Sequence, residues 1–218
     1  MPPSSTIPSP RWVIPSFVLR VEDLNHPGAT IFFDNVKPKR ALEDAVMASY
    51  KAMYTLATSP THVKSITLVL RSFEGVAYTF GTHANKEINL SLDHIKNSES
   101  HAQDEILGVL THEVVHCYQY NAKDTCPGGL VEGIADFVRL HAGYVPPHWR
   151  PSCRDKWDAG YDATAYFLDW IEKRCGDGTV SKINGSMKDS RYSDKVFQDA
   201  TGHRVEKLWE QYCEHLKL

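Results

Sequence analysis

Residues 103–121, QDEILGVLTHEVVHCYQYN, decide how the centre of this 218-residue chain folds. Apolar residues recur in this stretch at spacings of three and four, which predicts a helix with one buried face. They are Leu107, Leu110, Val114 and Cys117. Gly108 lies within the same helix, where glycine costs roughly 1 kcal/mol relative to alanine. We expect that this glycine allows another backbone to approach the helix closely. The alternative is a tolerated defect.

A second face of this predicted helix carries the pattern H-E-x-x-H. His112 and His116 are four residues apart, so their side chains lie one turn above each other. Two imidazoles at that spacing can hold one zinc ion. Glu113, beside the first histidine, can reach a water at the same ion and act as its general base.

A third metal ligand is expected on the next predicted helix, residues 129–142, which follows a glycine-bearing loop. Glu132 and Asp136 are four residues apart among apolar neighbours, an unfavourable place for unpaired charge. A catalytic zinc ion usually has three protein ligands, and its histidines usually donate their free N–H to an acceptor. We therefore predict Glu132 as the third ligand and Asp136 as that acceptor. An ordinary solvated pair of carboxylates is the alternative.

The order of the predicted elements indicates an α+β fold in one domain. Strands dominate the first part of the chain and helices the rest, which predicts an N-terminal mixed sheet with a helix, a central motif helix and a C-terminal helical subdomain. The extended segments are 12–20, 29–33, 65–71, 76–80 and 87–92. The helices are 39–57, 103–121, 129–142, 161–174, 192–200 and 204–216.

The stretch HEVVHCYQY…GGLVEGIADFVRLHAGY resembles the plant basic secretory protein family, which has fungal and bacterial relatives. The segments VEDLNHPGATIFF, SITLVLRSFEGVAYTFG, KEINLSLDHI and AGYDATAYFLDWIE also look like parts of that family. The family is placed among zincin-like peptidases that use a glutamate ligand. The resemblance implies a zincin-like fold, Zn²⁺ held by His112, His116 and Glu132, Glu113 as catalytic base, and a peptide or protein substrate.

The zincin resemblance also implies an edge strand at the rim of the cleft, antiparallel to its neighbour. Here that strand is 76–79, and we expect Ala77 and Tyr78 to contact an extended peptide that pairs with it. A strand covered by other parts of the chain is the alternative.

An oxyanion formed during peptide hydrolysis needs a hydrogen-bond donor besides the metal. Tyr161 stands at the first turn of a predicted helix, where a side chain can lean over a cleft, and is our first candidate. Tyr166 and Tyr144 are alternative donors, and a core role for Tyr161 is a further possibility.

Three functions fit these motifs. The first is a zinc metallopeptidase; the second is a defence-related or binding protein that keeps a zinc site with little turnover. The third is a zinc hydrolase of a non-peptide amide or ester. Glu113 favours turnover, since a structural site needs no base and is usually closed by four protein ligands.

The composition limits the partners and the location. The net charge is −3, so the chain is not basic as the family name would suggest, and residues 37–40 are the one compact basic cluster. We expect no nucleic-acid partner, no membrane partner because no apolar run approaches ~18 residues, and a monomer. Residues 1–10 are predicted to form a disordered arm before a metallopeptidase domain at 11–218. The start lacks the apolar segment of a signal peptide, which predicts a cytoplasmic protein or a trimmed secreted one.

The five cysteines contain no C-x-x-C pair, which argues against a structural zinc site. In a secreted protein we expect Cys126–Cys153 or another pair to form a disulfide. In a cytosolic protein all five would be reduced.

Overall fold

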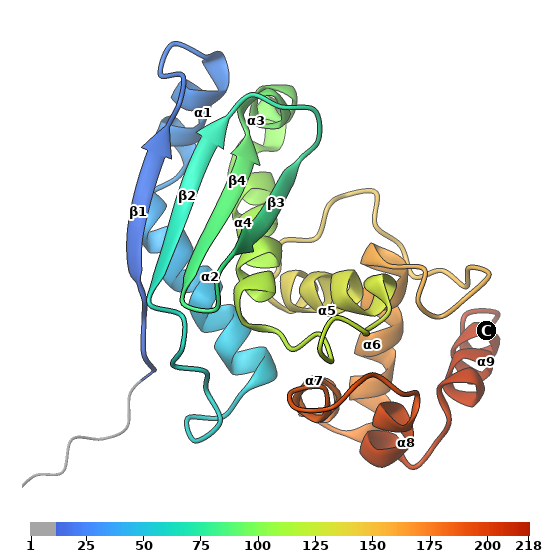
Figure 1. Cartoon of the computed structure of the whole chain (residues 1–218). Coiled ribbons are helices and arrows are strands. Elements are labelled where there is room, and N and C mark those ends of the chain that lie inside the picture. The colour runs from blue at the N-terminus through green and yellow to red at the C-terminus, as the bar shows by residue number, and fades with distance from the viewer. Residues whose placement is uncertain (1–11) are drawn as a thin grey trace, which may run out of the picture.

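The strands of the protein form one sheet, and most of the helices follow it in the chain, as a computed structural model of residues 12–218 shows (Figure 1). The arm predicted for residues 1–10 lies outside the described residues. The α+β class predicted from the sequence is confirmed. The strands are β1 (Ser16–Val21), β2 (Ser65–Arg71), β3 (Ala77–Gly81) and β4 (Asn85–Ser91). The helices are α1 (Pro27–Asn35), α2 (Pro38–Met53), α3 (Leu92–Asn97), α4 (Ala102–Tyr118), α5 (Gly128–His141), α6 (Tyr161–Cys175), α7 (Thr179–Ser186), α8 (Lys195–Thr201) and α9 (Val205–His215), with a 3-10 turn η1 at Glu99–His101.

The sheet is mixed and has the order β1-β2-β4-β3. β1, β2 and β4 are parallel, whereas β3 pairs antiparallel with β4, in a register that places Ala77 opposite Leu90 and Gly81 opposite Lys86. Within residues 12–218, β3 therefore has one edge without a partner strand. The antiparallel edge strand predicted at residues 76–79 is confirmed as an edge strand.

Helices cover one face of the sheet, and α4 lies at the centre of the molecule (Figure 1). Ile66, Leu68 and Leu70 alternate along β2 and are completely buried, because side chains at alternate positions of a strand share one face. α4 is buried on nearly all sides, since the sheet and α2 contact it from one side and α5 from another. This explains why Thr111, His112 and Glu113 are buried as well.

The segment 29–33, expected to be extended, is helical and belongs to α1. A short apolar run cannot be assigned to strand or helix by periodicity alone. The signals that decide it precede the run: His26 Nδ1 accepts a hydrogen bond from the amide of Gly28 at 3.0 Å, and Pro27 occupies the first turn. Phe32 then packs into the core, completely buried.

Other boundaries also differ from the prediction. α2 ends at Met53, earlier than the predicted 57, α8 begins at Lys195, later than the predicted 192, and α3 and α7 were not predicted. The predicted helices at 129–142, 161–174 and 204–216 are confirmed within one or two residues. None of the helices among residues 12–218 is both long enough and apolar enough to span a membrane.

Close packing of α5 against α6 depends on Gly133. A Cβ atom at this position would overlap the side chain of Thr164 on α6. The hydroxyl of Thr164 is fixed in turn, donating to the Trp157 carbonyl at 2.8 Å and accepting from the Gly160 amide at 2.9 Å. These contacts set the position of Tyr161, the first residue of α6.

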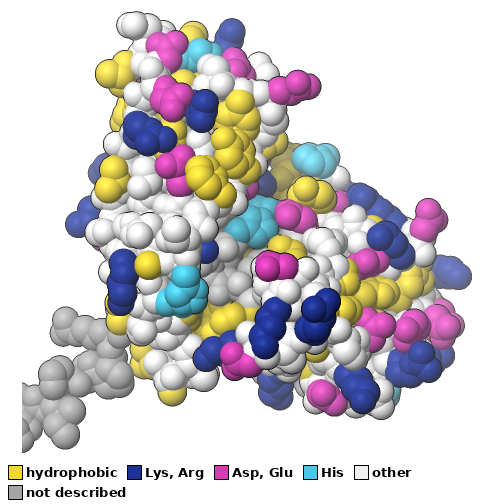
Figure 2. Space-filling view, viewed as in Figure 1, with side chains coloured by type: hydrophobic (Ala, Val, Ile, Leu, Met, Phe, Trp, Pro, Cys, Tyr) yellow, Lys and Arg dark blue, Asp and Glu magenta, His cyan; other side chains and the backbone are white. Residues whose placement is uncertain are grey.

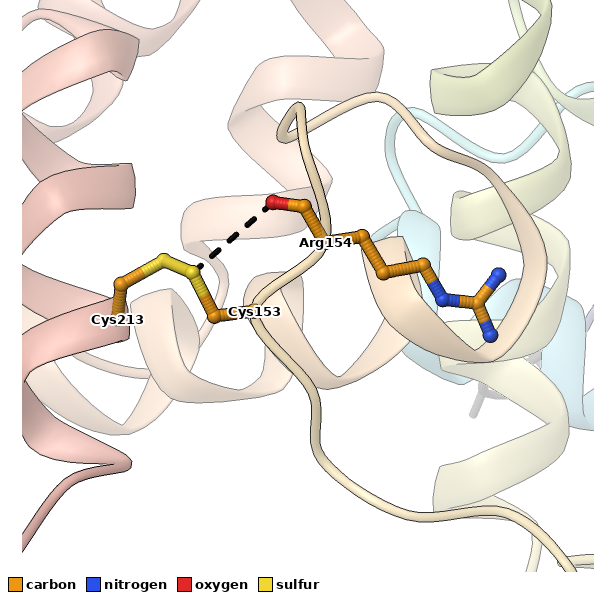
Figure 3. Close-up of a disulfide and its surroundings, with 3 residues drawn as sticks. All are labelled: Cys153, Arg154 and Cys213. Carbon is orange, nitrogen blue, oxygen red and sulfur yellow. Dashed lines mark hydrogen bonds between the residues drawn. A yellow bond between two sulfur atoms is a disulfide. The ribbon is translucent and has the colours of Figure 1, made fainter.

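A disulfide between Cys153 and Cys213 ties the loop between α5 and α6 to α9, with Cα atoms 5.2 Å apart (Figure 3). Of the pairings left open by the sequence, the named one, Cys126–Cys153, does not form, and another pair does. Cys126 is a free thiol whose Sγ lies 3.5 Å from Sδ of Met187. The loop that this disulfide holds also carries Trp149, which lines the cleft around His112 and Glu132.

Candidate metal centre

Three side-chain atoms converge at the middle of the molecule. Nε2 of His112 lies 3.0 Å from Nε2 of His116 and 3.1 Å from Oε2 of Glu132, and the third separation is 3.6 Å. A tetrahedral ion with bonds of ~2.0–2.1 Å separates its ligand atoms by roughly 3.3 Å. The group could therefore hold one metal ion, and no other set of three His, Cys, Asp or Glu residues does so within residues 12–218.

The chain reverses between α4 and α5 through an unusual left-handed turn. Ala122, Lys123 and Asp124 have φ of 55°, 57° and 62°, a region that costs an L-residue roughly 1–2 kcal/mol. Asn121 holds the turn, since its side chain donates to Oδ1 of Asp124 at 2.7 Å and accepts from the Asp124 amide at 3.1 Å. The reversal allows Glu132 on α5 to meet the histidines on α4.

Asp136 lies behind the group and orients His112. Its Oδ1 is 2.6 Å from Nδ1 of His112, and only 2% of Asp136 is exposed. With the proton on Nδ1, the Nε2 lone pair points toward Glu132 and His116. Asp136 is thus where it was predicted, at the free nitrogen of a candidate ligand.

The electrostatics of the group favour a cation. Burial alone would lower the pKa of His112, but hydrogen bonds to Asp136 and Glu132 outweigh it and raise the pKa above its usual value. Burial alone would raise the pKa of Glu132, but the adjacent imidazoles of His112 and His116 hold it below its usual range. A metal ion here would pair with the Glu132 carboxylate and would displace the additional proton from His112.

Glu113 is buried beside the group and is tied to the edge strand. Its Oε2 accepts a hydrogen bond from Oγ1 of Thr79 at 2.6 Å, and Thr79 lies 3.1 Å from the Glu113 carbonyl as well. The role of Thr79 was missed, although its position two residues after Ala77 places both on the same face of β3. Tyr78 points the other way and packs against Phe73 at 5.2 Å.

Tyr161 stands over the candidate ligands. Its φ of 47° is unusual for a residue other than glycine, and its ring lies nearly parallel to that of His112 at 6.3 Å. The side chain is 57% exposed. The negative charge of Glu132, and then burial, raise the pKa of its phenol, which remains a hydrogen-bond donor. The two alternative donors, Tyr144 and Tyr166, do not line the cleft that contains the candidate metal ligands.

Comparison with known proteins identifies the family. The model of the BSP family, described as a peptidase of plants and bacteria, matches residues 14–212. The chain belongs to this family. The family predicted from the sequence is thereby confirmed, and it makes peptides or proteins the expected class of substrate. No curated protein and no solved structure shows a significant match.

In this member of the BSP family, the candidate metal group lies in a cleft of about 890 Å³. The cleft separates the sheet from the C-terminal helices, and Figure 2 shows it as a hollow with histidine at its floor. Ala77 and Tyr78 line one wall, with Tyr161 and Trp149 among the other lining residues. Every site residue predicted from the sequence therefore lies at this one cleft.

Gly108, one turn before His112, is approached by a side chain and not by a backbone as expected. A Cβ atom there would lie 2.6 Å from Nε and 2.9 Å from Cζ of Arg139. The guanidinium thus rests directly on α4. Glycine at this position gives Arg139 its place in the cleft.

We predict that Gly108→Ala destabilises the protein. The new methyl group would displace the buried guanidinium, which should lower the free energy of unfolding by about 1–3 kcal/mol despite the better helix propensity of alanine. Gly185→Ala on α7 is the control, because a Cβ atom there would have no other part of residues 12–218 within 4 Å, apart from its chain neighbours and the backbone of α7; it should leave stability unchanged or raise it by up to ~1 kcal/mol. Urea denaturation measures the free energy of unfolding of both variants. Equal values for the two variants would show that the Arg139 guanidinium moves aside without loss of stability.

Proposed function

We propose that this protein is a zinc-dependent peptidase in which His112, His116 and Glu132 hold the metal and Glu113 is the general base. The observation that carries the proposal is the convergence of three ligand atoms, 3.0–3.6 Å apart, beside a buried carboxylate in an open cleft. Three protein ligands are typical of a catalytic zinc site, because a fourth position stays open for water or substrate.

The residues around the metal would divide the work of hydrolysis. Zinc at this site would lower the pKa of the attacking water and polarise the scissile carbonyl. Glu113 then accepts a proton from the water and passes it to the leaving amine. Thr79 supports this role, since its hydroxyl occupies Oε2 of Glu113 and leaves Oε1 for the water. Asp136 keeps His112 in the tautomer that binds metal.

Tyr161 would donate a hydrogen bond to the oxyanion. Its place over the candidate ligands supports this role, and so does a backbone conformation that other contacts must stabilise. A phenol that stays protonated at neutral pH can stabilise developing charge on the carbonyl oxygen.

The free edge of β3 would bind the substrate backbone. The strand borders the cleft at Ala77, Tyr78 and Thr79, and its outer edge has no partner strand among residues 12–218. An extended peptide can add to such an edge through main-chain hydrogen bonds. Glu113 is hydrogen-bonded to Thr79 of this strand. A peptide paired with β3 would therefore have its scissile bond beside the base.

We expect purified protein to bind about one zinc ion per chain and to cleave peptides. Glu113→Gln should keep the zinc but lose about 10²–10⁴-fold in kcat, because the base is gone and the ligands are intact. Metal analysis and a panel of quenched fluorescent peptides measure both quantities. Tyr161→Phe should lose about 10–10³-fold in kcat and also keep its zinc.

Several outcomes would contradict this proposal. Wild-type activity equal to that of Glu113→Gln, with zinc bound in both, would favour the binding-protein alternative. Cleavage of esters or non-peptide amides, but of no peptide in the panel, would favour the other hydrolase.

Thr79→Val should lower kcat about tenfold with little change in KM, because it frees the Glu113 carboxylate without touching the zinc ligands. Thr79→Ser retains the hydroxyl and should restore most of the activity. A loss in Thr79→Ser with none in Thr79→Val would indicate a packing role for the Thr79 methyl group instead.

Backbone N-methylation of a cleaved peptide should weaken cleavage at every second position only. Alternate amides of a strand point toward the neighbouring strand, and each lost main-chain hydrogen bond should reduce kcat/KM by up to about tenfold. Unmethylated peptides of the same sequence are the control. Equal tolerance at all positions would exclude pairing with β3.

A further inference from the structure

One end of the cleft holds a charged cluster that the proposed chemistry does not use. Arg139, Glu105 and His94 line the same cleft as the candidate metal ligands. Nη2 of Arg139 donates to Oε2 of Glu105 at 2.9 Å, and Nε2 of His94 lies 2.9 Å from the other oxygen. Burial alone would raise the pKa of Glu105, but the His94 hydrogen bond and the Arg139 charge lower it to about 2.

The guanidinium is held rigidly on three sides. Nε donates to the Tyr144 carbonyl at 2.9 Å, Nη2 is bound to Glu105, and the indole of Trp149 lies 5.2 Å from Cζ. Gly108 of α4 lies directly beneath the guanidinium. An arginine ordered in this way would lose little further entropy on binding a ligand.

The remaining nitrogen of Arg139 has no protein partner. Among residues 12–218, Nη1 forms no hydrogen bond, and it is not one of the fully buried atoms that lack a partner, although only 7% of the residue is exposed. Because Arg139 lines the cleft, Nη1 has two N–H donors to offer a ligand there. In a peptide substrate, a carboxylate is the anionic group that matches a guanidinium, through charge-assisted hydrogen bonds.

The charges along the cleft differ between its two parts. Glu113, Glu132 and Asp136 gather at the candidate metal centre, so an anionic group of the substrate is repelled there unless it binds the metal. Beside Arg139, the charge of the neighbouring carboxylate, Glu105, is compensated, because Glu105 contacts both Arg139 and His94. A substrate carboxylate is thus best accommodated beside Arg139.

The position of Arg139 indicates which part of the substrate it meets. Gly108, on which it rests, precedes His112 by four residues, or ~6 Å of helix rise, which equals about two residues of an extended chain. β3 starts at this end, since the Val76 carbonyl accepts from the Ser91 amide just before α3, and it reaches Glu113 at Thr79 (Figure 1). A peptide antiparallel to β3, the slightly more stable pairing, directs its C-terminal part toward Arg139.

We propose that Arg139 determines specificity by binding a substrate carboxylate one or two residues to the C-terminal side of the scissile bond. The carboxylate belongs either to an acidic side chain or to the C-terminus of a short peptide. The inference rests on the proposed function, because it uses the peptide orientation and the metal centre described above.

The test uses one cleavable peptide sequence in matched forms. Glu replaces Gln at each of the two positions after the scissile bond, and the same peptide ends there in a free carboxylate or an amide. Affinity is measured calorimetrically with zinc-loaded Glu113→Gln, and kcat/KM with the wild type. Each carboxylate that reaches Arg139 should improve both by about tenfold or more. The comparison of Glu with Gln tests an acidic side chain, and the comparison of the free carboxylate with the amide tests the C-terminus.

Variants assign the effect to Arg139. Arg139→Met with Glu105→Gln removes both charges together, so no buried charge is left unpaired. The preference should disappear in this double variant. Arg174→Met is the control, because Arg174 also stacks on a tryptophan at 5.2 Å, on α6 and outside the cleft; the preference should remain. Should the double variant fail to fold, the lack of any carboxylate preference in the wild type would still overturn the inference.

The outcomes separate this inference from the proposed function. Cleavage with no preference for carboxylates overturns the role of Arg139 and leaves the peptidase intact. Carboxylate-selective binding without any cleavage supports Arg139 and overturns the peptidase. A preference that persists in the double variant also overturns the inference.

Discussion

The hydrogen bond between His112 and Asp136 joins α4 to α5 in the middle of the protein, and the site depends on it. Asp136 is 2% exposed, and a buried carboxylate without a partner would be strongly unfavourable. Removing one member of such a buried pair typically costs about 3–5 kcal/mol. The two helices are therefore held at the separation at which Glu132, one turn before Asp136, meets His112 and His116.

Close approach of the chain to itself shapes the rest of the cleft. Gly133 lets α6 pack directly on α5, and this brings Tyr161 over the candidate metal ligands. Gly108 lets Arg139 lie across α4, so that a cation occupies one end of an otherwise acidic groove. The disulfide at Cys153 holds the loop that carries Trp149, which stacks on the same guanidinium. Disulfides are typical of oxidising compartments.

Elements with strong local signals could be predicted, and those decided by tertiary contacts could not. The periodicity of residues 103–121 and 129–142 predicted α4 and α5 within a few residues, and alternation at 87–92 predicted β4. The segment 29–33 was assigned wrongly because its apolar run suits either a strand or a helix. Cysteine spacing could not select the disulfide partner either, since pairing depends on which chain segments the fold brings together.

By itself, the sequence determined which side chains share the face of α4 at the candidate site. Histidines four residues apart must share a helix face, and an adjacent glutamate must then lie beside whatever they hold. Only the tertiary structure decided the neighbours of these residues: Thr79 on Glu113, Tyr161 over His112, and Arg139 on Gly108. Local spacing sets which residues share one element, whereas contacts between elements depend on packing over long sequence distances.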